Sequence, residues 1–239
     1  MRYLLNNPVA MILIALMAAN SFLSGRFENP ADWFMNTLIL LPAIIIGLSF
    51  HEFAHAKVSN ILGDDLPELQ GRVTINPKAH IDPIGFIALL FVGFGWGKPV
   101  QINPQNYKKP RRDELLVAIA GVTMNLILAV LFIGIFRLLV EFQYEFITET
   151  SMGSIISQMI YAIIQINIVL MIFNLLPIPP LDGFNIVTQI FNLRNTQLYY
   201  QIYDKGFIIL LLLIIFNITD KILIPAVNIV WNLLWGIFF

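Results

Sequence analysis

The sequence contains no cysteine and few charged residues, and both shortages limit what the protein can be. Without cysteine, disulfides and thiolate zinc sites are excluded, so any metal must be held by His, Asp or Glu. Charged residues make up 12% of the chain, about half the share found in soluble domains. The net charge of −1 gives no indication of nucleic-acid binding. Hydrophobic residues account for 58% of the chain, and this composition predicts a polytopic membrane protein.

The apolar segments predict an all-α fold with about six transmembrane helices. Spans are expected at about 8–23, 34–62, 114–136 and 152–176, and 206–239 is either two short spans or one broken helix. We interpret the first segment as an uncleaved span rather than a signal peptide. No internal repeat or sizeable soluble appendage is visible, so we expect a single transmembrane domain over residues 1–239 with its core at about 34–190.

The pattern changes between the second and third predicted spans. Leu69, Val73 and Ile75 alternate with polar residues, which predicts one short β-strand, although an ordinary surface loop fits equally well. Residues 84–97 are apolar but too short for a complete span, and glycines crowd their end. This segment is typical of a re-entrant segment that dips into the membrane.

The loop at 98–113 is rich in Lys and Arg, whereas the loop at about 141–149 is acidic. Positive charge marks the cytoplasmic side of a membrane protein, so we place loop 98–113 in the cytoplasm. Two predicted spans precede this loop, and the N-terminus is therefore expected in the cytoplasm as well.

The most informative stretch is His51-Glu52-Phe53-Ala54-His55, at the end of an apolar run. A helix advances about 100° per residue, so the two histidines share one face and could hold one Zn²⁺, with Glu52 beside them as a candidate base. With three histidines in the chain, this pattern arises by chance on the order of once in a thousand such sequences. The alternative, that both histidines are satisfied by neighbouring polar groups, leaves a costly cluster at the end of a membrane span.

A catalytic zinc needs a third protein ligand and an open position. Asp182 is expected at the cytoplasmic end of a span that runs in the same direction as the His51 helix, and the prolines at 177–180 free the backbone to aim it inward. We therefore predict Asp182 as the third ligand. His80 is the alternative ligand, and a gate or loop-orienting role is the other interpretation of this residue.

These residues also carry a family resemblance. The segments 51–55, 121–125 and 174–183 resemble the three ordered motifs of the site-2 protease family of intramembrane zinc metalloproteases, and 71–85 resembles its compact prokaryotic members. Val122 stands where relatives often have proline. No PDZ-like or CBS-like segment is visible, so regulation by such domains is not expected.

The resemblance implies hydrolysis of peptide bonds in or near a substrate's transmembrane segment. One Zn²⁺ per chain would be bound by His51, His55 and Asp182, and Glu52 would act as base in the attack of a zinc-bound water. It also implies that Asn125 lies near the site, where it and Asn174 would contact the substrate backbone or the oxyanion. Expected partners are the lipid bilayer and transmembrane or signal-peptide-like substrates, in a prokaryotic plasma membrane, with the active site open to the cytoplasm.

Two further points come from the residues themselves. The strand around Val73 and Ile75 could hold an unwound substrate by strand addition. A polytopic membrane metal-ion transporter or metal-binding protein is the alternative function, because intramembrane His and Asp also mark ion pathways. A transporter, however, predicts ligands at several depths and gives Glu52 no special role. The sequence identifies neither the substrate nor the oligomeric state.

Overall fold

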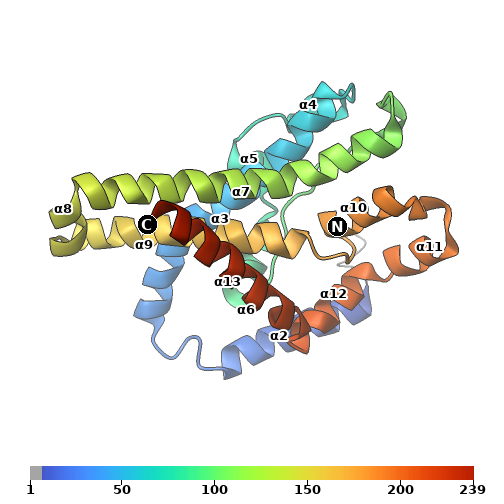
Figure 1. The fold of residues 1–239 in the computed structure, drawn as a ribbon. Helices are drawn as coiled ribbons and strands as arrows, with labels where there is room; N and C mark the ends of the chain where they lie inside the picture. The colour runs from blue at the N-terminus through green and yellow to red at the C-terminus, as the bar shows by residue number, and fades with distance from the viewer. Residues whose placement is uncertain (1–6) are drawn as a thin grey trace.

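The computed structural model describes residues 7–239, which fold into helices joined by turns and short loops (Figure 1). The first six residues, with the predicted cytoplasmic N-terminus, lie outside the described residues. Over residues 7–239, four helices are long and apolar enough to cross a membrane: α3 (Pro30–Ile61), α7 (Pro110–Phe142), α9 (Ser151–Asn174) and α13 (Ile218–Phe238). The prediction of an all-helical polytopic membrane protein is therefore confirmed.

Three further apolar helices are shorter, namely α2 (Pro8–Leu23), α6 (Pro83–Val92) and α12 (Gly206–Ile215). The region 206–239 forms two helices because Asn217, between α12 and α13, adopts a left-handed conformation with φ 53°. Of the roughly six predicted spans, four thus have spanning length in the described part of the chain. Six spans remain a prediction.

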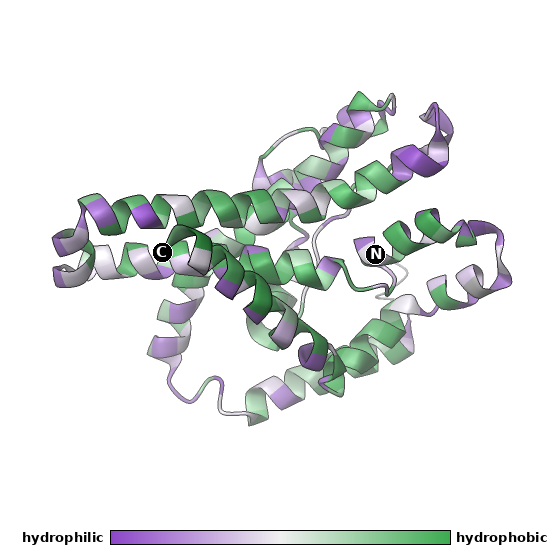
Figure 2. Cartoon of the chain, in the orientation of Figure 1, coloured by the Kyte–Doolittle hydropathy of each residue, from purple (hydrophilic) through white to green (hydrophobic). Residues whose placement is uncertain are grey.

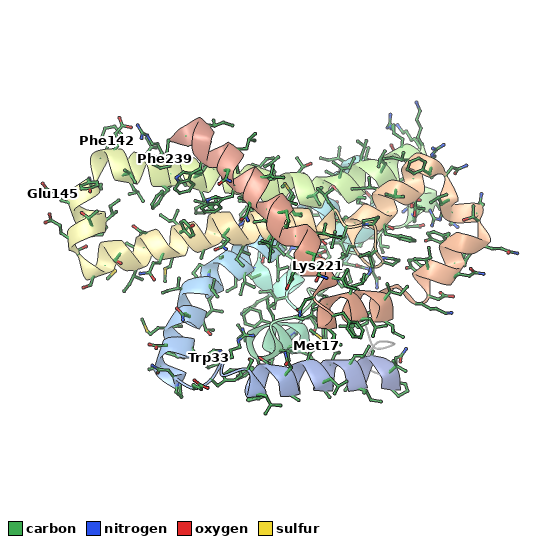
Figure 3. The ribbon with its side chains drawn as sticks, turned by 60° about the horizontal axis from the view of Figure 1, so that its bottom comes forward. Met17, Trp33, Phe142, Glu145, Lys221 and Phe239 are labelled. Atoms are coloured by element: carbon green, nitrogen blue, oxygen red, sulfur yellow. The ribbon has the colours of Figure 1, made fainter. Side chains whose placement is uncertain are left out.

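The remaining helices are short connectors. They are α4 (Leu66–Leu69), α5 (Pro77–His80), η1 (Pro104–Asn106), α8 (Tyr144–Glu149), α10 (Asp182–Phe191), η2 (Leu193–Asn195) and α11 (Gln197–Tyr203). The connector α8 joins α7 to α9 at one end of an antiparallel pair, where Figure 3 shows Phe142 and Glu145. The helices α10 and α11 follow α9 at the opposite end (Figure 1).

The prediction of a strand around Val73 and Ile75 is wrong. The described residues form no strand there, because α4 ends at Leu69 and Gly71 turns the chain with φ 67°. The backbone N–H of Arg72 then donates to Pro67 O, so local turns take up the groups that a strand would pair. The alternation assumed that Arg72 faces water, but its side chain is buried. Strand addition at this segment is therefore no longer supported.

The segment predicted as re-entrant contains α6. The Asp82 side chain caps this helix by accepting hydrogen bonds from the N–H groups of Ile84 and Gly85, and Gly93 ends it with φ 83°. Its length of 10 residues corresponds to a rise of about 15 Å, half the thickness of a bilayer core. A complete crossing by α6 alone is thus excluded, and the re-entrant path remains a prediction.

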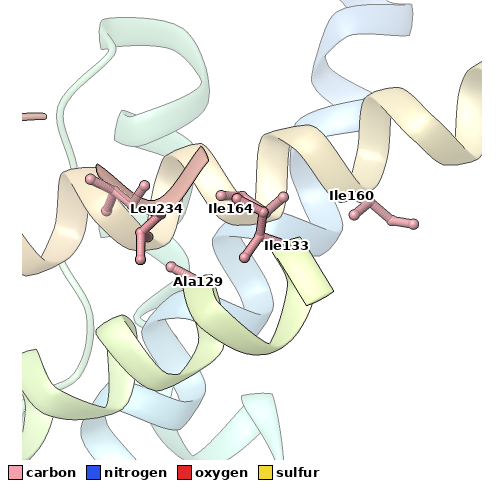
Figure 4. Packing of buried hydrophobic residues seen from close by; sticks show 6 residues of the cluster. Ala129, Ile133, Ile160, Ile164 and Leu234 are labelled. Atoms are coloured by element: carbon pink, nitrogen blue, oxygen red, sulfur yellow. The ribbon is translucent and has the colours of Figure 1, made fainter. Parts of the chain in front are cut away.

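The helices α3, α7 and α9 pack against one another and form the centre of the molecule. The contacts of α7 and α9 with α13 are made by small and branched apolar side chains, a cluster shown in Figure 4: Ala129, Ile133, Ile160, Ile164, Ile168 and Leu234. The outward faces of the long helices are also apolar (Figure 2). Such surfaces suit a lipid environment, in which close packing rather than water exclusion holds helices together.

Candidate metal centre

Three side chains that could bind a metal meet where α3 and α10 approach each other. His51 and His55 lie one turn apart on α3, and Asp182 is the first residue of α10. The Nε2 atoms of the histidines lie 3.0 Å apart. The Oδ2 atom of Asp182 lies 3.2 Å from each of them. The structure thus brings together the three predicted ligands.

The turn between α9 and α10 delivers Asp182 to this point. α9 ends at Asn174, and the following residues, which include Pro177, Pro179 and Pro180, run without a helix until Asp182. The first turn of α10 then folds back against the end of α9, where a Cβ on Gly183 would lie 2.2 Å from Leu175 O. Glycine at 183 therefore permits the close return that aims Asp182 at the histidines.

Hydrogen bonds fix which ring nitrogen of each histidine carries a proton. The Nδ1 atom of His55 lies 2.7 Å from Val117 O, and the Nδ1 atom of His51 lies 2.6 Å from Asn125 Oδ1. Both partners are acceptors, so both Nδ1 atoms must be donors in neutral rings. Each Nε2 is therefore a bare lone pair directed at the other and at Asp182.

This donor set fits a cation. When both rings are neutral, three acceptor atoms face one another, and Asp182 Oδ2, 3.2 Å from each Nε2, is buried with no other hydrogen-bond partner within residues 7–239. Lone pairs so placed repel unless a positive charge lies among them. A tetrahedral zinc holds N and O ligands at 2.0–2.2 Å, which sets such ligands about 3.4 Å apart. The separations of 3.0 and 3.2 Å are close to this spacing.

The long helix α7 passes directly over both imidazole rings at Gly121. A Cβ at this position would lie 2.4 Å from His55 Nε2 and 2.6 Å from His51 Cε1. No side chain could occupy that space without displacing a ring. Gly121 thus provides the room in which the two imidazoles stand side by side.

Asn125 lies close to the site, as the resemblance implied, and its side chain contacts His51. Its side chain is fully buried, and its amide nitrogen donates to Gly47 O at 3.2 Å and to Asn167 Oδ1 at 2.9 Å. Since its oxygen already accepts from His51, both amide protons and the oxygen are occupied. Asn125 is therefore placed to orient the candidate ligand His51, both of its N–H groups are engaged within the protein, and contact with a substrate remains a prediction. Asn174, the other predicted substrate contact, does line the cavity described next.

A cavity of about 510 Å³ opens beside the three ligands. Glu52 lines it together with the ligands, and its Oε2 accepts a hydrogen bond of 3.0 Å from the Val100 backbone N–H. Among the described residues, its other oxygen has no hydrogen-bond partner in the structure. Glu52 is therefore held at the cavity wall with one carboxylate oxygen available to a water or substrate.

The extended segment 97–103 forms part of this wall, which no sequence pattern had indicated. The buried guanidinium of Arg72 holds it by donating to the carbonyl oxygens of Lys98 and Pro99, each at 3.2 Å, and also to Ala79 O. The Lys98 N–H donates to His80 O at 2.7 Å. No sequence signal could have found this wall, because a buried arginine that binds carbonyl oxygens cannot be told from a surface arginine by sequence alone.

Asp64, just beyond α3, anchors the far end of the same segment. Its carboxylate accepts from the Asn103 backbone N–H at 2.7 Å, from Asn106 Nδ2 at 2.8 Å and from Ser59 Oγ at 3.0 Å. Burial alone would raise the pKa of Asp64, but these hydrogen bonds hold the pKa below its usual value. The ionised form of Asp64 therefore ties the cavity wall to the end of α3.

His80 lies outside the group of converging ligands. Its ring is fully buried, and its Nε2 donates to Thr74 O at 2.6 Å. Burial keeps the pKa of His80 below its usual value, so the ring is neutral. This geometry supports the loop-orienting interpretation and gives no support to His80 as a ligand. Val73 and Ile75, the predicted substrate strand, are likewise not among the residues that line the cavity.

Comparison with known proteins places this arrangement in a family. The sequence model described as peptidase family M50 matches residues 139–216, which include Asp182. YwhC of Bacillus subtilis (strain 168), by its name a candidate zinc metalloprotease, is 40% identical over 189 residues, which cover 79% of this chain and 85% of YwhC. Two proteins named Rip2, also candidate zinc metalloproteases by name, match more distantly.

The Rip2 protein of Mycolicibacterium smegmatis is 25% identical over 219 residues, or 87% of this chain and 80% of its own length. The Rip2 protein of Mycobacterium tuberculosis is 27% identical over 187 residues, or 74% and 68% of the two chains. No solved structure matches the chain.

Proposed function

The chain belongs to peptidase family M50, and from this premise we propose that it is an intramembrane zinc metalloprotease that hydrolyses peptide bonds in or near transmembrane segments of other membrane proteins. One observation carries the proposal. Three potential ligand atoms, His51 Nε2, His55 Nε2 and Asp182 Oδ2, converge beside a carboxylate, Glu52, in a single cavity. A cation site next to a general base is the minimum that a metallopeptidase needs.

His51, His55 and Asp182 would hold one zinc ion. When bound there, zinc supplies Lewis acidity, which polarises a substrate carbonyl and lowers the pKa of a water ligand to about 7. The closed surroundings support this role, since both histidines are buried and α7 covers their rings at Gly121. The cavity provides the open side from which substrate and water reach the ion.

Glu52 would move the proton. One of its oxygens is held by the Val100 N–H, so the carboxylate is fixed at the cavity wall with the other oxygen free. In this position Glu52 can accept a proton from the attacking water and return it to the nitrogen of the leaving amine. A helical substrate conceals its carbonyl groups in hydrogen bonds, so its chain must unwind before it can enter the cavity.

The charge distribution supports an active site that faces the cytoplasm. The cavity wall formed by residues 99–104 is followed closely by Lys108 and Lys109 in the same loop and by Arg111 and Arg112 in the first turn of α7. Positive charge of this kind marks the cytoplasmic side. We accordingly place the mouth of the cavity at the cytoplasmic face of a prokaryotic plasma membrane.

The proposal is tested with purified protein in detergent by measuring zinc content and cleavage of a model transmembrane substrate. Wild type and Glu52→Gln are compared, and Glu145→Gln in α8 is the matched control, because Glu145 is exposed at the α8 end of the molecule (Figure 3). We expect about one zinc per chain in all three proteins. Cleavage should fall by about 10²–10⁴-fold in Glu52→Gln and stay unchanged in Glu145→Gln.

Two results would overturn the proposal. Absence of stoichiometric zinc from the wild type would contradict the assignment of a zinc site. Equal cleavage by wild type and Glu52→Gln would contradict the assignment of Glu52 as the general base. If zinc is bound but no cleavage occurs, uptake of zinc into sealed vesicles would support the alternative of a transporter.

A further inference from the structure

We propose that Asn167 of α9 is a positioning residue for the metal centre, and that it acts through Asn125 to fix the orientation and tautomer of His51. This inference rests on the proposed zinc site. The three side chains come from three different helices and form one line of hydrogen bonds. Asn167 Oδ1 accepts from Asn125 Nδ2 at 2.9 Å, and Asn125 Oδ1 accepts from His51 Nδ1 at 2.6 Å.

The direction of this line is set by backbone carbonyl groups, which can only accept. Asn167 Nδ2 donates to Ile163 O at 2.8 Å, so its oxygen must face Asn125. Asn125 then directs both of its N–H groups toward acceptors, one to Asn167 and the other to Gly47 O. Its oxygen is thereby left for His51.

The consequence for His51 follows directly. An oxygen beside Nδ1 keeps the proton on that nitrogen and leaves Nε2 bare, which is the form that binds a metal. If the Asn125 amide were turned around, an N–H would face Nδ1 and favour a proton on Nε2 instead. Asn167 makes that reversed state costly, because it would set two amide oxygens against each other.

The two histidines are supported by different means. His55 is oriented by a backbone carbonyl, Val117 O, which no substitution removes. His51 depends on two side chains that are both fully buried within membrane-spanning helices. Polar groups in such surroundings are costly unless they are hydrogen bonded, so their pairing is strongly favoured.

Asn167 has no direct route to the chemistry. Neither Asn167 nor Asn125 lines the catalytic cavity. Any effect of Asn167 on metal binding must therefore pass through Asn125 and His51. This separates Asn167 from the ligands and from Glu52, and it defines the experiment.

The test measures zinc affinity by competition with a chromogenic chelator and records the absorption spectrum of the Co²⁺-substituted protein. Asn167→Leu removes the polar amide at similar volume, and Asn232→Leu is the matched control, because Asn232 is an exposed asparagine within α13. Loss of a partner that orients a metal ligand lowers affinity by about 10–100-fold. We expect that loss, with an altered Co²⁺ spectrum, in Asn167→Leu, and wild-type behaviour in Asn232→Leu.

A double variant distinguishes positioning from a general structural effect. Asn125→Leu alone should weaken zinc binding at least as much as Asn167→Leu, and the two changes together should be no worse than Asn125→Leu. Additive losses would overturn the proposal. So would unchanged affinity and spectrum in Asn167→Leu.

Two further measurements distinguish failure of this inference from misfolding of the variant and from failure of the proposed function. If Asn167→Leu does not fold, Asn167→Asp takes its place, because its carboxyl group keeps an acceptor toward Asn125, and zinc affinity between those of wild type and Asn125→Leu is expected. If the wild type itself binds no zinc, the proposed metal site is wrong, and the role of Asn167 in positioning His51 is not what has failed.

Discussion

The backbone N–H of Val100 lies 3.0 Å from Oε2 of Glu52, and this contact joins the candidate base to a segment 48 residues further along the chain. Arg72 holds that segment in place through the carbonyl oxygens of Lys98 and Pro99. The position of Glu52 therefore depends on a guanidinium that touches neither the ligands nor the cavity.

Arg72→Met should destabilise the protein and reduce cleavage without removing zinc. It leaves three carbonyl oxygens without their donor, and each buried unsatisfied group costs about 1–3 kcal/mol. Thermal unfolding, zinc content and cleavage measured on one preparation check this. Arg72→Lys should recover part of the loss, and Lys78→Met, at an exposed position of α5, should have no effect. Full activity in Arg72→Met would contradict the role of Arg72.

Gly121→Ala should lower zinc affinity by at least about 10-fold, as expected when a ligand is displaced or its support is lost. The added methyl group would overlap the imidazole of His55 and push one ring aside. Gly236→Ala is the matched control, because a Cβ at that position of α13 meets no atom within 4 Å. Chelator competition on both variants gives the answer, and equal affinities would show that α7 can shift to make room.

Asp182→Asn should abolish zinc binding while leaving the metal-free protein at least as stable as the wild type. The amide retains the shape of aspartate and can donate an N–H to a bare Nε2, which relieves the repulsion among three acceptors. Unfolding temperatures recorded with and without zinc test this. A ligand that binds only the folded state raises stability by about 2.7 kcal/mol at 100 times its Kd. That increase should appear in the wild type and be absent from Asp182→Asn.

Protonation of Asp64 should lower the stability of the protein in acid. The pKa of Asp64 is lower in the folded state than in the unfolded state, so the folded state favours the ionised carboxylate. Its contribution is complete above the unfolded pKa of about 3.9 and is lost as the pH falls through the folded pKa. Unfolding of wild type and Asp64→Asn is compared from about pH 6 to about pH 2, so that the measurements lie on both sides of the unfolded pKa of aspartate, about 3.9.

The wild type should lose stability below about pH 4, whereas Asp64→Asn should start less stable and change less over that range. Asp65→Asn, at the exposed neighbouring position, should follow the wild type. Parallel curves for wild type and Asp64→Asn would show that other carboxyl groups cause the acid transition.

The sequence was most informative where function requires a fixed spacing. His51, Glu52 and His55 lie on one helix, with the two histidines one turn apart, so their geometry follows from the period of the helix alone. Asp182 could be predicted because it was expected at the cytoplasmic end of a span that runs in the same direction as the His51 helix. The all-helical fold followed from long apolar segments in the same way.

Interactions between distant segments could not be predicted in this way. The alternation around Val73 assumed that each polar residue faces water, whereas Arg72 is buried and binds carbonyl oxygens of residues 79, 98 and 99. The family resemblance implied that Asn125 lies near the metal site and contacts the substrate backbone or the oxyanion. Its occupied amide becomes visible only when Asn167, on another helix, is placed beside it. Asn167 itself had a recognisable signal, as a polar residue in the middle of an apolar span.

The division of the ligands between α3 and the start of α10 has a consequence for biosynthesis. Both histidines enter the membrane early, but the carboxylate that completes their site lies roughly 130 residues further along the chain. At about 5–20 residues per second, the ribosome needs on the order of ten seconds to reach it. A nascent chain in that interval carries two histidines without the carboxylate that completes the candidate metal site. Proteolytic capacity thus arrives late in translation, after α7 and α9 have been made.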